Sequence, residues 1–260
     1  MKKNTCLKDS SFLMAFLLVV SFGFGQMNDL IISEYAEGSS NNKYVEIFNG
    51  TGADVDLTDY QVWKAVNGGT FPPTTGFNLF NLSGTLVNGD TYIIANISAD
   101  PTIIAAADLV SGNANWNGND AVGIAKDDGT GTFLLIDAVG TDGADPVTGW
   151  DVAGTTNATQ NNTLVRKAGV CGTNINWTTS AGTTVDNSEW VVLDNNNWSD
   201  IGTHTTDCCI YSSTWTAAGW IPSTPTPSIN TNVIIDAFYD TNINTSFTAC
   251  SLTLKSASFL

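Results

Sequence analysis

Basic residues and histidine are scarce in this chain of 260 residues. It has 9 Lys and Arg against 25 Asp and Glu, a formal net charge of −16, and its single histidine is His204. Nucleic-acid-binding proteins present clustered Lys and Arg to phosphates, so we expect no nucleic-acid partner. One histidine excludes three-histidine zinc sites and argues against histidine-dependent nuclease or Ser-His-Asp chemistry. We therefore expect no enzymatic activity, no catalytic residues and no cofactor.

Long apolar runs are also missing, apart from one near the start. Phe12–Phe24 follows Lys2, Lys3 and Lys8 and precedes the small-residue junction Gly25–Gln26. This order is typical of a secretory signal peptide over residues 1–25. A membrane anchor is the alternative, but a spanning helix needs about 20 apolar residues. We expect a secreted or cell-surface protein with no transmembrane segment after cleavage.

Cysteines are few, and four remain after the leader: Cys171, Cys208, Cys209 and Cys250. Four cysteines permit three pairings. Neighbouring α-carbons lie about 3.8 Å apart, which is closer than a disulfide prefers, so Cys208 and Cys209 should not bond each other. We expect Cys171 to pair with Cys208 or Cys209, and the other to join Cys250 or stay free. Neither CxxC-like spacing nor histidine support for a zinc site is present, so we expect no metal ligands among them.

Short runs rich in β-branched and aromatic residues recur between Gly, Asn and Asp. In Tyr44–Phe48, Val45 and Ile47 alternate with Glu46, which predicts a strand with one apolar and one polar face. The clearest predicted strands are Leu30–Tyr35, Tyr44–Phe48, Tyr60–Trp63, Thr91–Ile97, Ala121–Ile124, Phe133–Val139, Thr163–Arg166, Trp190–Leu193 and Val233–Ala237.

One helix is predicted. Asp100 can cap its start, Pro101 suits the first helical position, and Thr102–Leu109 follows with an alanine run that Gly112 would end. Many short strands with one short helix indicate an all-β protein built as an antiparallel sandwich.

The composition changes beyond Cys208–Ser213. Ser223–Pro227 reads STPTP, which favours a stiff, extended segment. Two strand-like runs follow, Val233–Ala237 and Phe247–Leu254, with too few apolar residues for a strong core. We interpret residues 208–260 as a linker and the start of an incomplete second β module.

Residues Asp29–His204 resemble a lamin tail domain of the secreted bacterial type. The pieces that carry the resemblance are LIISEYAEGSSNNKYVEIFNGTGADVDLTDYQV, GTLVNGDTYIIAN, NDAVGIAKDDGTGTFLLIDAVGTDG, TLVRK and EWVVLDNNNWSDIGTH. The resemblance implies an immunoglobulin-like β-sandwich over residues 26–207, with no agreed catalytic residues. The long insert around Val147–Asn162 departs from the family pattern. The segments STWTAAGWIPSTP and FTACSLTL are similar to repeat modules of Bacteroidetes-like surface proteins.

Calcium is the cation that the loops favour. Asp194–Asn197 offers side-chain oxygens, and so do Asp137, Asp142 and Asp145. Hard cations take such oxygen ligands, although no EF-hand spacing is present.

Aromatic side chains offer a second kind of site. Trp116 and Trp150 stand among Gly, Asn and Asp, which favours exposure, and exposed Trp rings suit a binding face for a protein or glycan. These observations predict a non-catalytic extracellular binding, adhesive or structural module. The alternative is an accessory N-terminal domain of a larger secreted hydrolase, such as an extracellular nuclease, whose catalytic part lies elsewhere.

Overall fold

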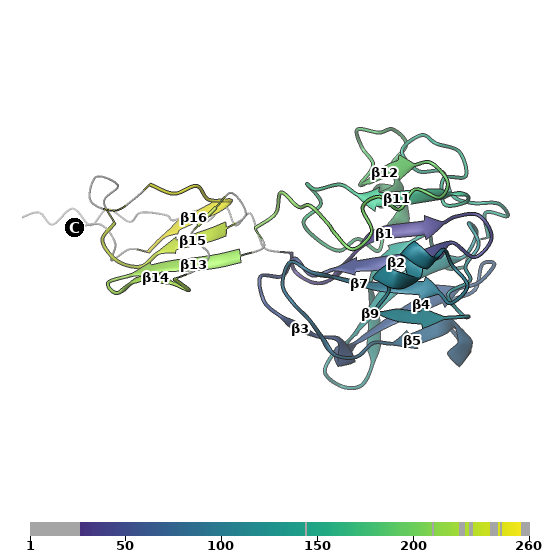
Figure 1. Cartoon of the computed structure of the whole chain (residues 1–260), viewed down its shortest axis with the longest axis horizontal. Helices are drawn as coiled ribbons and strands as arrows, with labels where there is room; N and C mark the ends of the chain where they lie inside the picture. The colour runs from purple at the N-terminus through teal and green to yellow at the C-terminus, as the bar shows by residue number, and fades with distance from the viewer. Residues whose placement is uncertain are drawn as a thin grey trace, which may run out of the picture.

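The structure, a computed structural model, describes residues 27–143, 145–209, 211–223, 227–228, 231–239, 244 and 246–255. The expected signal peptide lies outside these residues. Figure 1 shows a larger body that contains β1–β12 and a smaller body that contains β13–β16. Within the described residues, no helix is long and apolar enough to cross a membrane.

One layer of the larger body is a six-stranded sheet with the order β12-β11-β1-β2-β7-β8. Its neighbours pair antiparallel, except that β7 and β8 are parallel. The strands are β1 (Ile31–Glu37), β2 (Lys43–Phe48), β7 (Thr91–Asn96), β8 (Leu109–Ser111), β11 (Asn162–Arg166) and β12 (Trp190–Leu193).

The second layer is an antiparallel four-stranded sheet with the order β10-β9-β4-β5. Its strands are β4 (Tyr60–Ala65), β5 (Leu79–Asn81), β9 (Ala121–Asp127) and β10 (Phe133–Val139). A two-stranded ribbon, β3 (Val55–Asp56) with β6 (Thr85–Leu86), and two 3-10 turns, η1 (Leu57–Asp59) and η2 (Gly76–Asn78), complete this side. The predicted all-β, immunoglobulin-like sandwich is confirmed.

The main core lies between these two sheets. Val45 and Ile47 are fully buried in it, as the alternation in β2 predicted. Trp116 and Trp190 are the largest side chains that are completely buried. Their burial removes apolar surface from water, which is the main favourable term in folding.

The outer face of the six-stranded sheet is also buried around its central strand β2. Every residue of β2 is buried, Glu46 included, so its polar face does not meet solvent. Tyr44 and Ile103 of α1 (Pro101–Ala106) belong to one buried cluster on this face, and the side chains of Trp198 and Ile201 pack against that cluster. The alternation of polar and apolar residues therefore did not reveal that a further layer covers the strand.

Helix α1 begins as the sequence predicted, because the Asp100 side chain accepts a hydrogen bond from the Thr102 backbone N–H at 2.8 Å. It ends at Ala106, before the predicted Leu109, because Leu109 starts β8 and pairs with Ile94. A second helix, α2 (Trp177–Ala181), was not predicted. It has a single turn, which is too short to show a helical period.

The smaller body is one four-stranded sheet with the order β14-β13-β15-β16. Its strands are β13 (Tyr211–Thr216), β14 (Gly219–Ile221), β15 (Thr231–Ile235) and β16 (Ser251–Leu254). The pairs β13/β15 and β15/β16 are parallel, whereas β13 and β14 pair antiparallel. Aromatic rings of Trp215, Trp220, Tyr239 and Phe247 contact one another beside it.

Two disulfides lie at the connection between the bodies. Cys171 is bonded to Cys208, with 5.5 Å between their α-carbons, and Cys209 is bonded to Cys250, at 5.4 Å. Adjacent cysteines thus point in different directions. One ties the connection to the larger body, and the other ties it to the segment that leads into β16.

Candidate functional site

The two tryptophans expected to face a ligand do not form a common surface. Trp116 is completely buried, stacks on Tyr35 and donates from its indole N–H to the Ala36 carbonyl at 3.0 Å. The expectation of an exposed Trp116 is therefore wrong, because its polar neighbours belong to turns while its ring enters the core. Trp150 is partly buried against the core and meets Trp177 edge-on.

The aspartates considered for calcium do not converge on one point. Asp137 is completely buried and pairs with Arg166, so its assignment as a calcium ligand is wrong. Asp142 accepts from the Phe71 N–H at 3.0 Å, and Asp145 accepts from the Asn119 side-chain amide at 3.0 Å. Within the described part of the chain, no group of three His, Cys, Asp or Glu side chains could hold a metal ion.

The loop Asp194–Asn197 connects two parts of the fold. The Asn196 side-chain oxygen accepts from the Ser39 N–H at 2.9 Å and from the Asn42 side-chain amide at 3.2 Å. This asparagine oxygen therefore bridges the loop to the β1–β2 turn.

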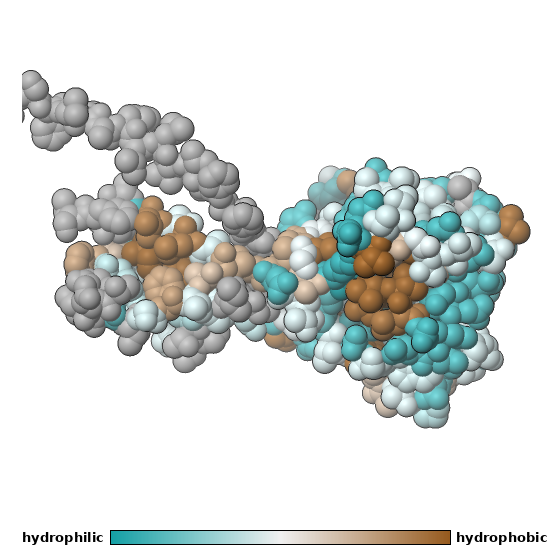
Figure 2. Space-filling model, turned by 90° about the horizontal axis from the view of Figure 1, so that it is seen from above, coloured by the Kyte–Doolittle hydropathy of each residue, from teal (hydrophilic) through white to brown (hydrophobic). Residues whose placement is uncertain are grey.

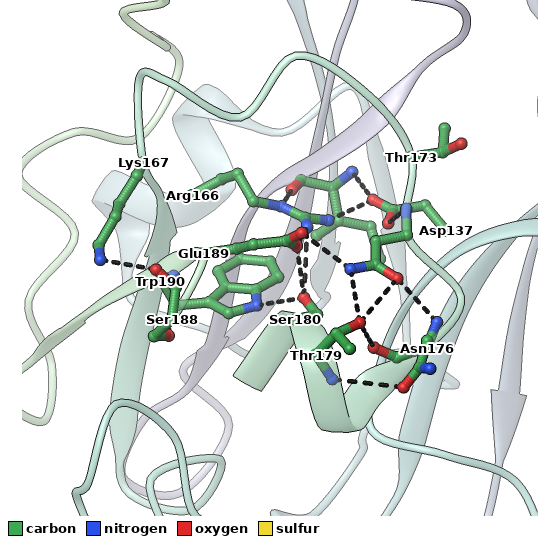
Figure 3. A network of polar contacts seen from close by, with 12 residues as sticks. Asp137, Arg166, Lys167, Thr173, Asn176, Thr179, Ser180, Ser188, Glu189 and Trp190 are labelled. Carbon is green, nitrogen blue, oxygen red and sulfur yellow. Dashed lines mark hydrogen bonds and ion pairs between the residues drawn. The ribbon is translucent and has the colours of Figure 1, made fainter. Parts of the chain in front are cut away.

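Arg166 at the end of β11 is the centre of a buried polar cluster (Figure 3). Its guanidinium lies 2.5 Å from the Asp137 carboxylate of β10 and 2.5 Å from the Glu189 carboxylate before β12. Its Nε donates to the Ile32 carbonyl of β1 at 3.0 Å, and its charge lies 4.2 Å from the Trp190 ring centre. These charge-assisted bonds hold both sheets to one side chain.

A second set of bonds satisfies the remaining atoms of this cluster. Ser180 of α2 donates to Glu189 at 2.7 Å and accepts from the Trp190 indole N–H at 2.9 Å. The Asn174 backbone N–H donates to Asp137 at 2.9 Å, and its side-chain amide donates to Glu189 at 2.8 Å. Burial raises the pKa of Asp137, and Arg166 acts in the opposite direction. The Arg166 cluster is therefore a structural connection between β10, β11, β12 and α2.

A cavity of about 300 Å³ lies beside this cluster. Val165 and Val191 face each other across β11 and β12 and form part of its lining, together with Lys167. The opposite wall is the segment 200–205, which contributes the side chains of Asp200, Thr203 and His204. Sequence reasoning missed this site, because only the packing of a late loop onto a strand edge creates it.

His204 lines this cavity in its neutral form. Burial lowers the pKa of His204 to about 4, and the positive charge of Arg166 contributes in the same direction. Its ring meets Phe48 edge-on at 4.8 Å, and its Nε2 atom is buried without a hydrogen-bond partner. A neutral imidazole of this kind is available as a hydrogen-bonding group and not as a charge at neutral pH.

The cavity lies next to an apolar strand edge. Strand β12 ends the six-stranded sheet, and Val191 is 44% exposed there. Figure 2 looks onto the side where β12 lies in Figure 1, and it shows a patch of hydrophobic residues on the larger body. Exposed apolar patches framed by polar residues are typical of interaction sites.

Comparison with known proteins gives one family. The sequence model of the Lamin Tail Domain matches residues 25–207. No curated protein and no solved structure compared with the chain matches it significantly.

Proposed function

Because the chain belongs to the lamin tail domain family over residues 25–207, we propose that it is a non-catalytic extracellular module that binds or holds another molecule. The family has an immunoglobulin-like fold, which agrees with such a role. We place the domain boundary after residue 207, because the sheet β14-β13-β15-β16 shares no strand with the sandwich.

The observation that carries this proposal is the contrast between the Arg166 cluster and the cavity beside it. The charged groups of the cluster, the buried Arg166 and Asp137 and the partly buried Glu189, bond to one another or to neighbouring backbone. The cavity, in contrast, opens beside an apolar strand edge and offers Val191, Thr203 and the neutral His204. Such a surface suits recognition of a protein segment or glycan more than chemical turnover.

Support for an extracellular place comes from the cysteines and from the leader-like start. Disulfides form and persist in oxidising compartments, and the described structure brings four cysteines into two bonds. Peptide mapping of the unreduced protein should find Cys171 linked to Cys208 and Cys209 linked to Cys250. Recovery of Cys171 as a free thiol would contradict this connectivity.

Turnover assays test the absence of catalysis. Purified Gln26–Leu260 should hydrolyse neither nucleic acid nor common glycans, with or without divalent metal. Turnover that disappears in His204→Ala or Asp200→Asn would overturn the proposal and would favour the role as part of a secreted hydrolase.

Binding assays test the cavity. A glycan array and a panel of extracellular proteins would identify a partner, and Val191→Arg should then weaken its binding at least tenfold. Val110→Arg is the matched control, because Val110 is a similarly exposed valine on β8, at the other end of the same sheet. An equal loss of binding in Val191→Arg and Val110→Arg would show that the partner does not bind at the cavity.

A further inference from the structure

Lys64 is a lysine in the interior of the sandwich. It follows Tyr60 and Val62 on the core-facing side of β4, and it pairs in register with the buried Val122 of β9. Only 4% of its surface is exposed. Lysine is almost never this buried unless it is paired, so its surroundings call for an explanation.

The Lys64 ammonium group meets carbonyl oxygens and no carboxylate. Its Nζ lies 2.5 Å from the side-chain oxygen of Asn115 and 2.9 Å from the backbone oxygen of Asn113. None of the ion pairs in the described part of the chain includes Lys64. Burial lowers the pKa of Lys64, and Asp120 opposes this shift. Burial therefore makes it easier to convert this ammonium group into the amine, which is the nucleophilic form.

Asp120 is a buried acid two residues before Val122, the residue that pairs with Lys64. It is 2% exposed, and its two oxygens accept from the Asn67 and Asn117 backbone N–H groups at 2.9 Å each. These bonds hold its carboxylate in place just before β9, one residue from the strand that pairs with Lys64. Asp120 also interacts electrostatically with Lys64.

We propose that Lys64 and Asn115 join in an intramolecular isopeptide bond, with Asp120 moving the proton. Lys64 Nζ gives a proton to the Asp120 carboxylate, and the resulting amine attacks the Asn115 side-chain carbonyl carbon. The bond from Nζ to Cγ forms, and the bond from Cγ to Nδ2 breaks. The proton on Asp120 and one of the two amine protons leave with Nδ2 as an ammonium ion, which restores the Asp120 carboxylate. Nothing is oxidised or reduced, and no further reactant is needed.

Several features of the site favour this reaction. The Asn113 carbonyl fixes Nζ beside the Asn115 side chain, which replaces a random encounter by a held geometry. Lys64 is only 4% exposed, whereas Asn115 lies at the surface, where the released leaving group can escape. The product would link residues 51 positions apart, and it would tie β4 covalently to the segment before β9. Such a link would resist pulling on an extracellular module.

Intact mass measurement of reduced Gln26–Leu260 tests the proposal. Formation of the bond releases one ammonia, so the protein should be lighter than its sequence mass by about 17 Da. Tryptic digestion should yield one branched peptide that contains Lys64, left uncleaved, and Asn115. A reduced protein at full sequence mass, with separate Lys64 and Asn115 peptides, would overturn the proposal.

Variants identify the source of the lost ammonia. Lys64→Met and Asn115→Ala should each restore the missing mass, and Asp120→Asn should slow or abolish the loss. Asn113→Ala is the matched control, because Asn113 contributes only its backbone oxygen, so the loss should remain. Cyclisation of an N-terminal Gln26 also removes ammonia, but it would persist in Asn115→Ala. A mass loss unchanged by Asn115→Ala, without the branched peptide, would therefore refute the bond.

Discussion

The Arg166 cluster and the pair Glu34–Glu46 lie on opposite faces of the six-stranded sheet and differ in how their charge is compensated. On the core side, Arg166 contacts two carboxylates, and each carboxylate accepts further hydrogen bonds. On the outer side, Glu34 and Glu46 face each other in register on β1 and β2. None of the described ion pairs includes either glutamate.

The outer pair is held by neutral donors alone. Tyr44 donates to Glu34 at 2.6 Å, while Ser33 and the Gly202 N–H donate to Glu46 at 2.7 Å each. The second carboxylate oxygen of Glu34 is buried without a partner. Burial accordingly raises the pKa of Glu34 to about 8 and that of Glu46 to about 7. A buried acid without a cation stays protonated, whereas one beside arginine can stay charged.

Removal of the Arg166 charge should disrupt the core-side cluster and cause the largest loss of stability. Arg166→Met leaves Asp137 buried without its partner, so we expect the free energy of unfolding to fall by about 3–5 kcal/mol. Urea unfolding of the variant measures the loss. The control is Lys126→Met, which breaks the partly exposed pair with Asp29 and should cost less than about 1 kcal/mol. Equal losses in the two variants would contradict the distinction between buried and surface pairs.

Alkaline pH should weaken the outer pair. The unfolded chain releases the protons of Glu34 and Glu46 above their ordinary pKa of 4.5, whereas the folded protein keeps them. The free energy of unfolding therefore falls as pH rises from 4.5 to about 8. Between pH 6.5 and 8 we expect a fall of about 2 kcal/mol, from about 1.4 kcal/mol per pKa unit.

The pH dependence of urea unfolding in Glu34→Gln sharpens this comparison. Glutamine cannot ionise, so the variant should lose most of the alkaline decline. Asp151→Asn, at an exposed aspartate, is the control and should keep it. A wild-type stability that stays flat or rises from pH 6.5 to 8 would show that the outer pair is not the destabilising element.

His204 should give a smaller effect in the opposite direction. The pKa of His204 is lowered from 6.5 to about 4. As pH falls, the unfolded chain therefore takes up the proton before the folded protein does, and the stability that the neutral His204 contributes is lost from pH 6.5 towards 4. Taken alone, this contribution is roughly 2–3 kcal/mol over that range, and the contributions of Glu34 and Glu46 have the opposite sign there and outweigh it. Relative to the wild type, His204→Gln should therefore gain stability in urea unfolding as pH falls from 6.5 to 4. A stability difference from the wild type that stays constant or shrinks over this range would contradict a neutral, buried His204.

Local sequence patterns predicted much of the sandwich. Val45 and Ile47 alternate with polar neighbours, and the alternation placed both correctly in the core. Asp100 and Pro101 predicted the start of α1, since a cap and a first-turn proline act within a few residues. Trp116 was misplaced because its neighbours indicate a turn but not the direction of its ring.

The sequence by itself determined the fold class and the scarcity of catalytic groups. Strand alternation and turn residues act over short distances, and a count of histidine does not depend on folding. Tertiary structure alone decided which polar groups meet: Arg166 with Asp137, Glu34 with Glu46, and Lys64 with Asn115. Their charges and reactivities depend on burial and on partners 12 to 51 residues away, which no local pattern encodes.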